Sequence, residues 1–193
     1  MAATARAPGR PMNPAIDEQI LSATQDLLIE EGFERLTMDA VARRCGASKA
    51  TIYRRWPGKV ALVVAASAVL LRPPPVPDTG SLHDDLLDCG RAYMQQEGRT
   101  VQVLANVTNA TRHDPDLRSA FREAIGSPYA GLFDAVLARA VHRGLIRPDL
   151  DLDMLARVFP AVAYQQLAAQ ARSITEDDVR RVVDAVLMPA LGS

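Results

Sequence analysis

The sequence predicts an all-α protein with an N-terminal three-helix helix-turn-helix domain and a C-terminal helical bundle, about nine helices in total. Three observations support this fold class. Apolar residues recur at three- and four-residue spacing along most of the chain, capping residues bracket these segments, and no segment shows a convincing strand pattern. With 193 residues, 48% of them hydrophobic and 23% charged, the chain can bury a core.

The first two predicted helices cover residues 14–31 and 38–45. In the first, apolar residues share one face, acidic residues occupy the first turn, and Gly32 follows the last turn. Thr37 precedes the second helix as a natural N-cap, and Gly46 has the conformational freedom to end it.

A third helix over residues 49–56 follows after only three residues, with Ser48 as its N-cap. Two short helices joined by so tight a turn that contains glycine form a helix-turn-helix unit. Pro57 and Gly58 end the third helix, and residues 59–71 form a fourth. The apolar run in this fourth helix is about 12 residues long, which is too short to span a bilayer and indicates a buried helix.

The third helix and its flanks form a purely cationic patch in a chain whose net charge is −1. Residues 1–71 contain 9 Lys and Arg against 7 Asp and Glu, whereas the remainder contains 13 against 16. A helix that exposes Lys and Arg, held by a preceding short helix, fits a DNA major groove about 12 Å wide. The patch therefore predicts DNA binding. Its six cations are Arg43, Arg44, Lys49, Arg54, Arg55 and Lys59.

The segment LTMDAVARRCGASKATIYRRWPGKVALVVAA resembles the DNA-binding domain of the TetR family of transcriptional regulators. The likeness extends over about 50 residues, with Trp56 where the family usually has Phe and Cys45 where it usually has Ala. It implies a sequence-specific regulator, in most cases a repressor that binds a palindromic operator on double-stranded DNA as a homodimer. A small, largely apolar effector would release it.

Individual roles in DNA binding follow from position and from the resemblance. Lys49, near the start of the third helix, is the strongest candidate for contacting base edges. Arg54 and Arg55 are expected to contact bases or phosphates, and for these two and Lys49 the alternative is a cation that is merely solvated. Arg43 and Arg44 either contact DNA or only favour the helix dipole. The resemblance implies phosphate contacts from Thr37, Ser48, Thr51, Tyr53 and Lys59, although capping alone would explain Thr37 and Ser48. Cys45 is interpreted as a small core residue, with a redox role as the alternative.

A proline-rich segment divides the chain into modules. Four prolines within residues 72–77 cannot continue a helix and predict a stiff, extended connector. The expected parts are a flexible arm (1–13), the DNA-binding domain with its connecting helix (14–71), the connector (72–80) and a helical ligand-binding and dimerisation domain (81–193).

Capping signals define the helices of the second domain. One helix is predicted from residue 82 to about residue 97, and another around residues 101–111. Ser127 and Pro128 repeat a cap-and-proline signature seen at Asp114 and indicate either a kink or a new start. The last two helices open at Asp151 and Thr175, and the segment ARAVHRGLIRPDLDLDMLARVF resembles the C-terminal domain of one TetR subgroup.

The last two helices carry continuous apolar stripes. Such a stripe could simply cover the core, but in the family these helices pair with their twins in a four-helix dimer interface. The interface positions expected from the resemblance are Val158, Val162, Val179, Val182, Val183 and Val186.

An effector pocket is expected among the helices between residue 82 and the helix that opens at Asp151. Apolar and aromatic residues with a few polar ones would line it, and each candidate is equally well explained as core. The candidates are Tyr93, Met94, Thr108, Phe133, Phe159 and Tyr164.

The sequence lacks the motifs expected of an enzyme or a metal-binding protein. His83, His113 and His142 have no metal-ligand spacing, and neither a Gly-rich phosphate loop nor a G-x-S-x-G turn is present, so no enzyme, metal site or cofactor is predicted. A constitutive DNA-binding protein without an effector is the alternative, but it has little use for the long second domain. Two distant cysteines and no export signal favour a cytoplasmic protein that contacts no membrane.

Overall fold

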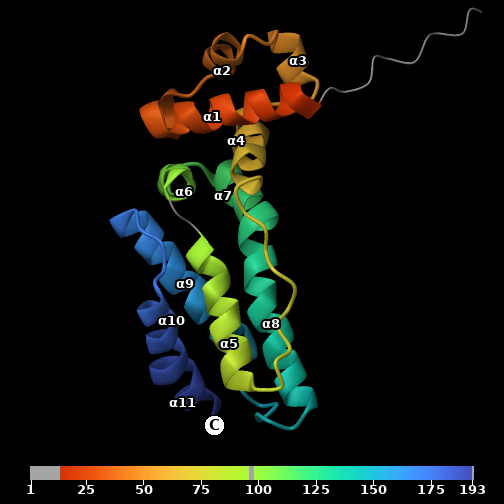
Figure 1. Cartoon of the computed structure of the whole chain (residues 1–193), viewed down its shortest axis with the longest axis vertical. Coiled ribbons are helices and arrows are strands. Elements are labelled where there is room, and N and C mark those ends of the chain that lie inside the picture. The colour runs from red at the N-terminus through yellow and green to blue at the C-terminus, as the bar shows by residue number, and fades with distance from the viewer. Residues whose placement is uncertain (1–13, 96–97, 193) are drawn as a thin grey trace, which may run out of the picture.

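The computed structural model describes residues 14–95 and 98–192, so the predicted N-terminal arm lies outside the described residues. Within these ranges the chain is helical and contains no strand, which confirms the predicted fold class. One long helix, α1, and two short ones, α2 and α3, form a compact head at one end, α4 leads out of it, and a helical bundle follows (Figure 1). We call the part formed by α1 to α3 the reading head.

The reading head begins with α1 (Pro14–Arg35), which is broken where the sequence predicts its end. Gly32, the predicted stop, adopts φ 77° and ψ 170°, a conformation that interrupts the helix. Helix α2 (Met38–Cys45) is capped by the Thr37 hydroxyl, which accepts a hydrogen bond from the Ala40 N–H at 3.1 Å. Gly46, with φ 68°, ends α2 as expected.

Helix α3 of the head and the connecting helix α4 are both shorter than the sequence pattern predicts. Helix α3 (Lys49–Tyr53) ends before Trp56, and in the turn that follows the Arg55 and Trp56 N–H groups both donate to the Ile52 carbonyl, at 3.0 and 2.9 Å. Helix α4 (Lys59–Ala68) ends three residues before the predicted boundary at Leu71. In both places a proline follows shortly, and it disfavours helical backbone in the residue before it.

The C-terminal bundle encloses a second apolar core. Gly90 in α5 lies so close to α9 and α10 that an added Cβ would stand 2.8 Å from Val179 and 2.9 Å from Phe159, which explains a residue without a side chain there. The elements are α5 (Leu82–Arg91), η1 (Ala92–Gln95), α6 (Arg99–Ala110), α7 (Pro115–Phe121), η2 (Arg122–Gly126), α8 (Ser127–His142), α9 (Leu152–Gln170), α10 (Glu176–Val182), η3 (Val183–Leu187) and α11 (Met188–Leu191).

Ser127 and Pro128 do not open a separate helix, but the helical backbone just before them is distorted. Helices α7 and α8 are joined by η2, a π-helical turn that ends two residues before Pro128. The same arrangement recurs where η3 precedes Pro189. Because proline lacks an N–H and its ring collides with the carbonyl four residues earlier, a widened turn accommodates it while the helix continues.

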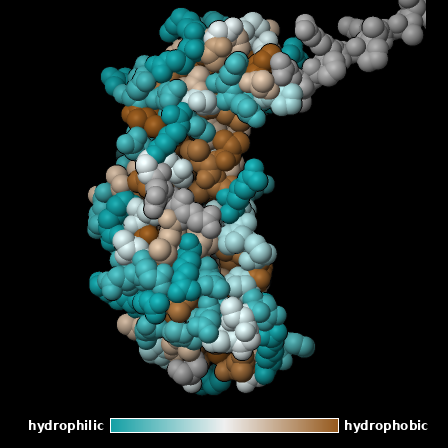
Figure 2. All heavy atoms as spheres, in the orientation of Figure 1, coloured by the Kyte–Doolittle hydropathy of each residue, from teal (hydrophilic) through white to brown (hydrophobic). Residues whose placement is uncertain are grey.

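The reading head packs directly against helix α6 of the bundle. The apolar core of the head, built on Ile20, Leu28 and Leu62, also contains Val103 and Val107 of α6. Figure 2 shows a hydrophobic band over α4 between the largely polar surfaces of the head and of the lower bundle. Residues on both sides of the predicted connector (72–80) thus contribute to the apolar core of the head.

No helix in the described ranges is both long and apolar enough to cross a membrane. The same residues contain no cluster of three or more His, Cys, Asp or Glu that could hold a metal ion.

Candidate nucleic-acid interface and ligand cavity

The outer surface of the reading head presents α3 and the end of α2. Tyr53 is 49% exposed, and Lys49, Arg54 and Arg43 are exposed as well. Arg43 and Arg54 make no ion pair within the described part of the chain, so their guanidinium groups are available to a partner. An exposed phenol and free cations on one helical unit match what phosphate and base contacts require.

Two cations of the patch already have acidic neighbours. The Lys49 ammonium lies 2.6 Å from a carboxylate oxygen of Asp39, and both side chains are exposed. Arg44 forms a fork-like pair with Glu30, with N–O distances of 3.0 and 2.5 Å. This pair raises the pKa of Arg44 and lowers that of Glu30, chiefly through the hydrogen bonds between them. DNA would have to compete with these exposed carboxylates.

Arg55 requires a correction. Its side chain is only 5% exposed and is paired with Asp17 of α1, and its guanidinium also donates a hydrogen bond to the Thr51 carbonyl at 3.2 Å. Arg55 follows Ile52 by three residues, so it lies on the inward face, which an inspection of charge alone does not reveal. We therefore assign Arg55 to positioning α3 against α1 rather than to contacting DNA.

The hydroxyl residues of the patch form caps. Ser48 Oγ accepts a hydrogen bond from the Thr51 N–H at 3.2 Å and lies 2.9 Å from Thr51 Oγ1. Since Thr37 caps α2 in the same way, capping accounts for these residues within the chain. Their phosphate contacts remain a prediction.

Lys59 and Cys45 are both partly buried. The Lys59 ammonium lies 4.1 Å from the centre of the Phe33 ring and donates to the Glu34 carbonyl at 3.2 Å, and burial lowers its pKa. Cys45 Sγ lies 3.8 Å from the Ala42 carbonyl, as a small helix-end residue would. Lys59 thus joins the start of α4 to the end of α1.

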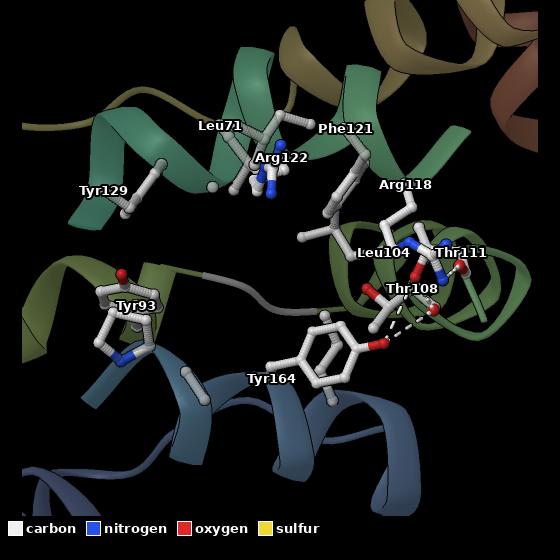
Figure 3. Close-up of a pocket in the computed structure, with 15 residues that line it drawn as sticks. Leu71, Tyr93, Leu104, Thr108, Thr111, Arg118, Phe121, Arg122, Tyr129 and Tyr164 are labelled. Atoms are coloured by element: carbon white, nitrogen blue, oxygen red, sulfur yellow. Dashed lines mark hydrogen bonds between the residues drawn. The ribbon is translucent and has the colours of Figure 1, made fainter. Parts of the chain in front are cut away.

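A cavity of about 330 Å³ opens inside the bundle, within the size range of small-molecule sites. Its walls come from η1, α6, the α7–η2–α8 segment and α9 (Figure 3). Three of the six expected residues line it, namely Tyr93, Thr108 and Tyr164. The other lining residues are Leu71, Leu104, Thr111, Arg118, Phe121, Arg122, Ile125, Gly126, Tyr129, Pro160, Ala163 and Leu167.

The other three expected residues do not line this cavity. Phe133 and Phe159 are fully buried and stack with ring centres 5.4 Å apart, and Met94 packs against the same core. Helical periodicity identifies inward positions, but it does not show which inward side chains border a space. Phe133 and Phe159 instead belong to a cluster of packed rings that includes Tyr93, whose ring centre lies 5.3 Å from that of Phe159.

Polar groups gather at one end of the cavity. Arg118 donates a hydrogen bond to the Thr111 carbonyl at 3.3 Å, and the Tyr164 hydroxyl lies 3.4 Å from Thr111 Oγ1 (Figure 3). Sequence reasoning missed Arg118 and Arg122. The sequence feature that could have identified them is the spacing of the two arginines, which are four residues apart on a segment whose Phe121 and Ile125 also line the cavity.

The predicted dimer positions divide into two groups. Val179, Val182 and Val183 are buried in the chain's own core, so their stripe covers that core and is not free for a partner. Val186 is 45% exposed, and Val158 and Val162 are half-buried. These last three remain the candidates for an interface.

Helix α6 links the cavity to the reading head. Leu104, Thr108 and Thr111 face the cavity, whereas Val103 and Val107 pack in the core of the head. At the start of the same helix, Arg99 donates hydrogen bonds to three groups of α1. These are Gln25 Oε1 at 2.9 Å, Asp26 Oδ1 at 2.7 Å and the Ser22 carbonyl at 2.9 Å.

Two family models match the chain. Residues 20–66 match the model described as bacterial regulatory proteins, tetR family, and residues 76–186 match the model described as a tetracyclin repressor-like C-terminal domain. The first match covers the reading head with most of α4, and the second covers most of the bundle.

Relatives of known sequence extend over nearly the whole chain. The HTH-type transcriptional regulator Rv1556 of Mycobacterium tuberculosis strain H37Rv is 35% identical over 187 residues, covering 94% of this chain and 93% of the relative. The DNA-binding transcriptional repressor TetR of Mycobacteroides abscessus is 33% identical over 172 residues, with 88% and 90% covered. These relatives are regulators of transcription, not enzymes.

Solved structures agree with the sequence relatives. The TetR family transcription regulator SCO0332 has 30% identity and a TM-score of 0.63, with 89% of this chain and 96% of that chain covered. The flavonoid-responsive regulator FrrA has 26% identity and a TM-score of 0.70, with 93% and 97% covered.

Proposed function

The chain belongs to the TetR family of DNA-binding transcriptional regulators, and from this we propose that it is a repressor that binds a palindromic operator as a homodimer and leaves when a small molecule fills the bundle cavity. Membership of a family of bacterial DNA-binding regulators supports a cytoplasmic location. The alternative is a constitutive DNA-binding protein whose cavity has no regulatory role.

Operator binding would use the exposed side of the reading head. Lys49, Tyr53 and Arg54 project from α3, and Arg43 lies at the end of α2. Two copies of α3 in a two-fold dimer would enter successive major grooves about 34 to 36 Å apart, which requires an inverted repeat in the DNA.

The dimer would form through the outer faces of α9 and of the α10–η3–α11 segment. Val186, Val158 and Val162 offer apolar surface there. A two-fold arrangement places the same faces of both subunits against each other, so a few apolar positions are used twice.

The proposed release mechanism rests on one observation. Residues of α6 line the cavity on one side and pack in the apolar core of the reading head on the other. Thr108 borders the cavity, and Val107, the residue before it, packs against the head. Because packed cores change arrangement in discrete steps, a ligand that displaces α6 would shift the head and alter the distance between the two copies of α3. The similar regulator FrrA, described as flavonoid-responsive, supports the idea of an effector.

Selection from a random DNA library tests the operator. Duplexes retained by the full chain should share an inverted repeat, and footprints should show two half-sites one helical turn or more apart. Retention without a common sequence would favour the constitutive alternative.

A further inference from the structure

The cavity contains cations but no acid to neutralise them. Arg118 and Arg122 are among its described lining residues, none of these residues is a carboxylate, and neither arginine makes an ion pair within the described chain. Of the five N–H donors of Arg118, only the bond to the Thr111 carbonyl is used. Both arginines are also exposed to solvent, so each guanidinium lies where the apolar space opens to water and can bind the anionic group of a ligand there.

Three buried hydroxyls of the lining lack a hydrogen-bond partner in the described chain, those of Tyr129, Thr108 and Tyr93, and the last two lie toward opposite ends of the cavity. Thr108 Oγ1 is buried beside Arg118, and Tyr93 Oη is buried toward the other end of the cavity (Figure 3). Burial raises the pKa of Tyr93, so its hydroxyl stays protonated and able to donate. Buried hydroxyls are nearly always hydrogen-bonded, so those of Thr108 and Tyr93 indicate where a ligand's polar atoms would lie.

The remaining lining is apolar and rich in rings. Tyr93, Phe121, Tyr129 and Tyr164 contribute aromatic surface, and Leu104 and Leu167 add aliphatic surface. Such walls favour a flat, largely apolar body by area burial and ring packing.

We propose that the cavity binds an aromatic organic acid, with its anionic group on Arg118 and the Thr108 hydroxyl and its apolar body extending toward Tyr93. This inference deepens the proposed function, because it gives the chemical class of the effector. Arg122, which lies beside Leu71 on another wall, contributes a weaker long-range attraction.

Two dyes with the same ring system test the charge requirement. 8-Anilinonaphthalene-1-sulfonate (ANS) carries an anionic group, and N-phenyl-1-naphthylamine (NPN) is the same body without it. The Arg118→Gln variant should weaken ANS binding about tenfold or more, the equivalent of one charge-assisted hydrogen bond, and should leave NPN affinity within about twofold. The Thr108→Val variant should weaken ANS by a smaller factor.

Matched variants locate the dyes. Arg147→Gln removes an exposed arginine outside the cavity and should change neither affinity, whereas Ala163→Phe adds a ring to the cavity wall and should weaken both dyes. Circular dichroism confirms that each variant is folded. Three results would overturn the inference. They are an equal loss of ANS and NPN affinity in Arg118→Gln, a larger loss of ANS affinity in Arg122→Gln than in Arg118→Gln, and unchanged affinity for both dyes in Ala163→Phe.

The outcome separates this inference from the proposed function. If ANS depends on Arg118 but does not change operator binding, the ligand chemistry stands and the release mechanism is wrong. If both dyes release the operator equally from the wild type and from Arg118→Gln, the release mechanism stands and the anion requirement is wrong.

Discussion

The side chain of Arg55 is paired with the carboxylate of Asp17 and lies almost wholly inside the reading head. This pair joins the segment just after α3 to the first turn of α1 and holds α3 against α1. A cation in the middle of a basic patch thus has a structural role.

Replacing Arg55 should therefore affect folding more than charge. Arg55→Gln leaves Asp17 without its partner, and we expect a loss of about 1 to 3 kcal/mol in the free energy of unfolding, measured by urea denaturation. Arg54→Gln, the matched change on the exposed side, should leave stability unchanged and lower the slope of log K against log salt by about one. A lower salt slope with unchanged stability in Arg55→Gln would return Arg55 to the DNA contacts.

The neighbouring pair of Lys49 and Asp39 yields a prediction about specificity. Lys49→Ala should cost about 1 to 3 kcal/mol on the operator and little on random DNA, because it removes a base contact. Asp39→Asn should strengthen binding to both DNAs, since it removes an anion 2.6 Å from the Lys49 ammonium. Gel-shift titrations at fixed salt measure both effects, and equal losses on operator and random DNA in Lys49→Ala would argue against base contact.

Much of the reading head could be predicted from sequence because its signals are local. The Thr37 and Ser48 caps and the glycine stops at Gly32 and Gly46 act within a few residues, and the structure confirms each of them. The burial of Arg55 depends on Asp17, 38 positions earlier, which no local pattern contains.

The cavity was harder to predict because a space is a property of several helices together. Tyr93, Phe133 and Phe159 all lie on inward faces, but only Tyr93 borders the space. Arg118 and Arg122 were missed because both are exposed to solvent, as most arginines are, and only the arrangement of several helices shows that they also line the cavity.

Val183 and Val186 distinguish the core from the proposed dimer interface. Val183→Asp places an unpaired charge in the chain's own core and should unfold the bundle, whereas Val186→Asp should keep the fold and weaken the dimer. Circular dichroism and light scattering on the two variants measure fold and mass. A folded dimer of unchanged stability in Val186→Asp would place the interface elsewhere.

The hydrogen-bonded pair of His83 and Asp184 predicts a small effect of pH on the free energy of unfolding. His83 Nε2 lies 2.7 Å from Asp184, and this hydrogen bond, together with a weaker one to Asp84, raises the pKa of His83. A raised pKa means that the stabilisation is present below the ordinary histidine pKa of about 6.5 and is lost as pH rises through the folded value. Because the pair is exposed, we expect less than about 1 kcal/mol.

The matched variant His83→Gln measures this contribution. Its melting temperature should lie below that of the wild type at pH 5.5, and the two should converge above pH 8. A constant difference across that range would show that the pair does not titrate as the structure implies.

Arg99 provides a control for coupling between the cavity and the head. Arg99→Gln removes the charged anchor to Asp26 while α6 keeps its cavity-lining residues. We expect ANS affinity in the absence of DNA to stay within about twofold of the wild type. The factor by which ANS and operator weaken each other's binding should fall toward one. Arg147→Gln, the exposed control, should leave that mutual effect intact.

The central claim is that occupancy of the cavity and binding of the operator oppose each other, and one pair of titrations tests it directly. ANS affinity is measured with and without saturating operator duplex, and operator affinity with and without saturating ANS. Because coupling between two sites is reciprocal, each ligand should weaken the other by the same factor, about 5- to 150-fold. Equal ANS affinity in the presence and absence of operator would contradict the account.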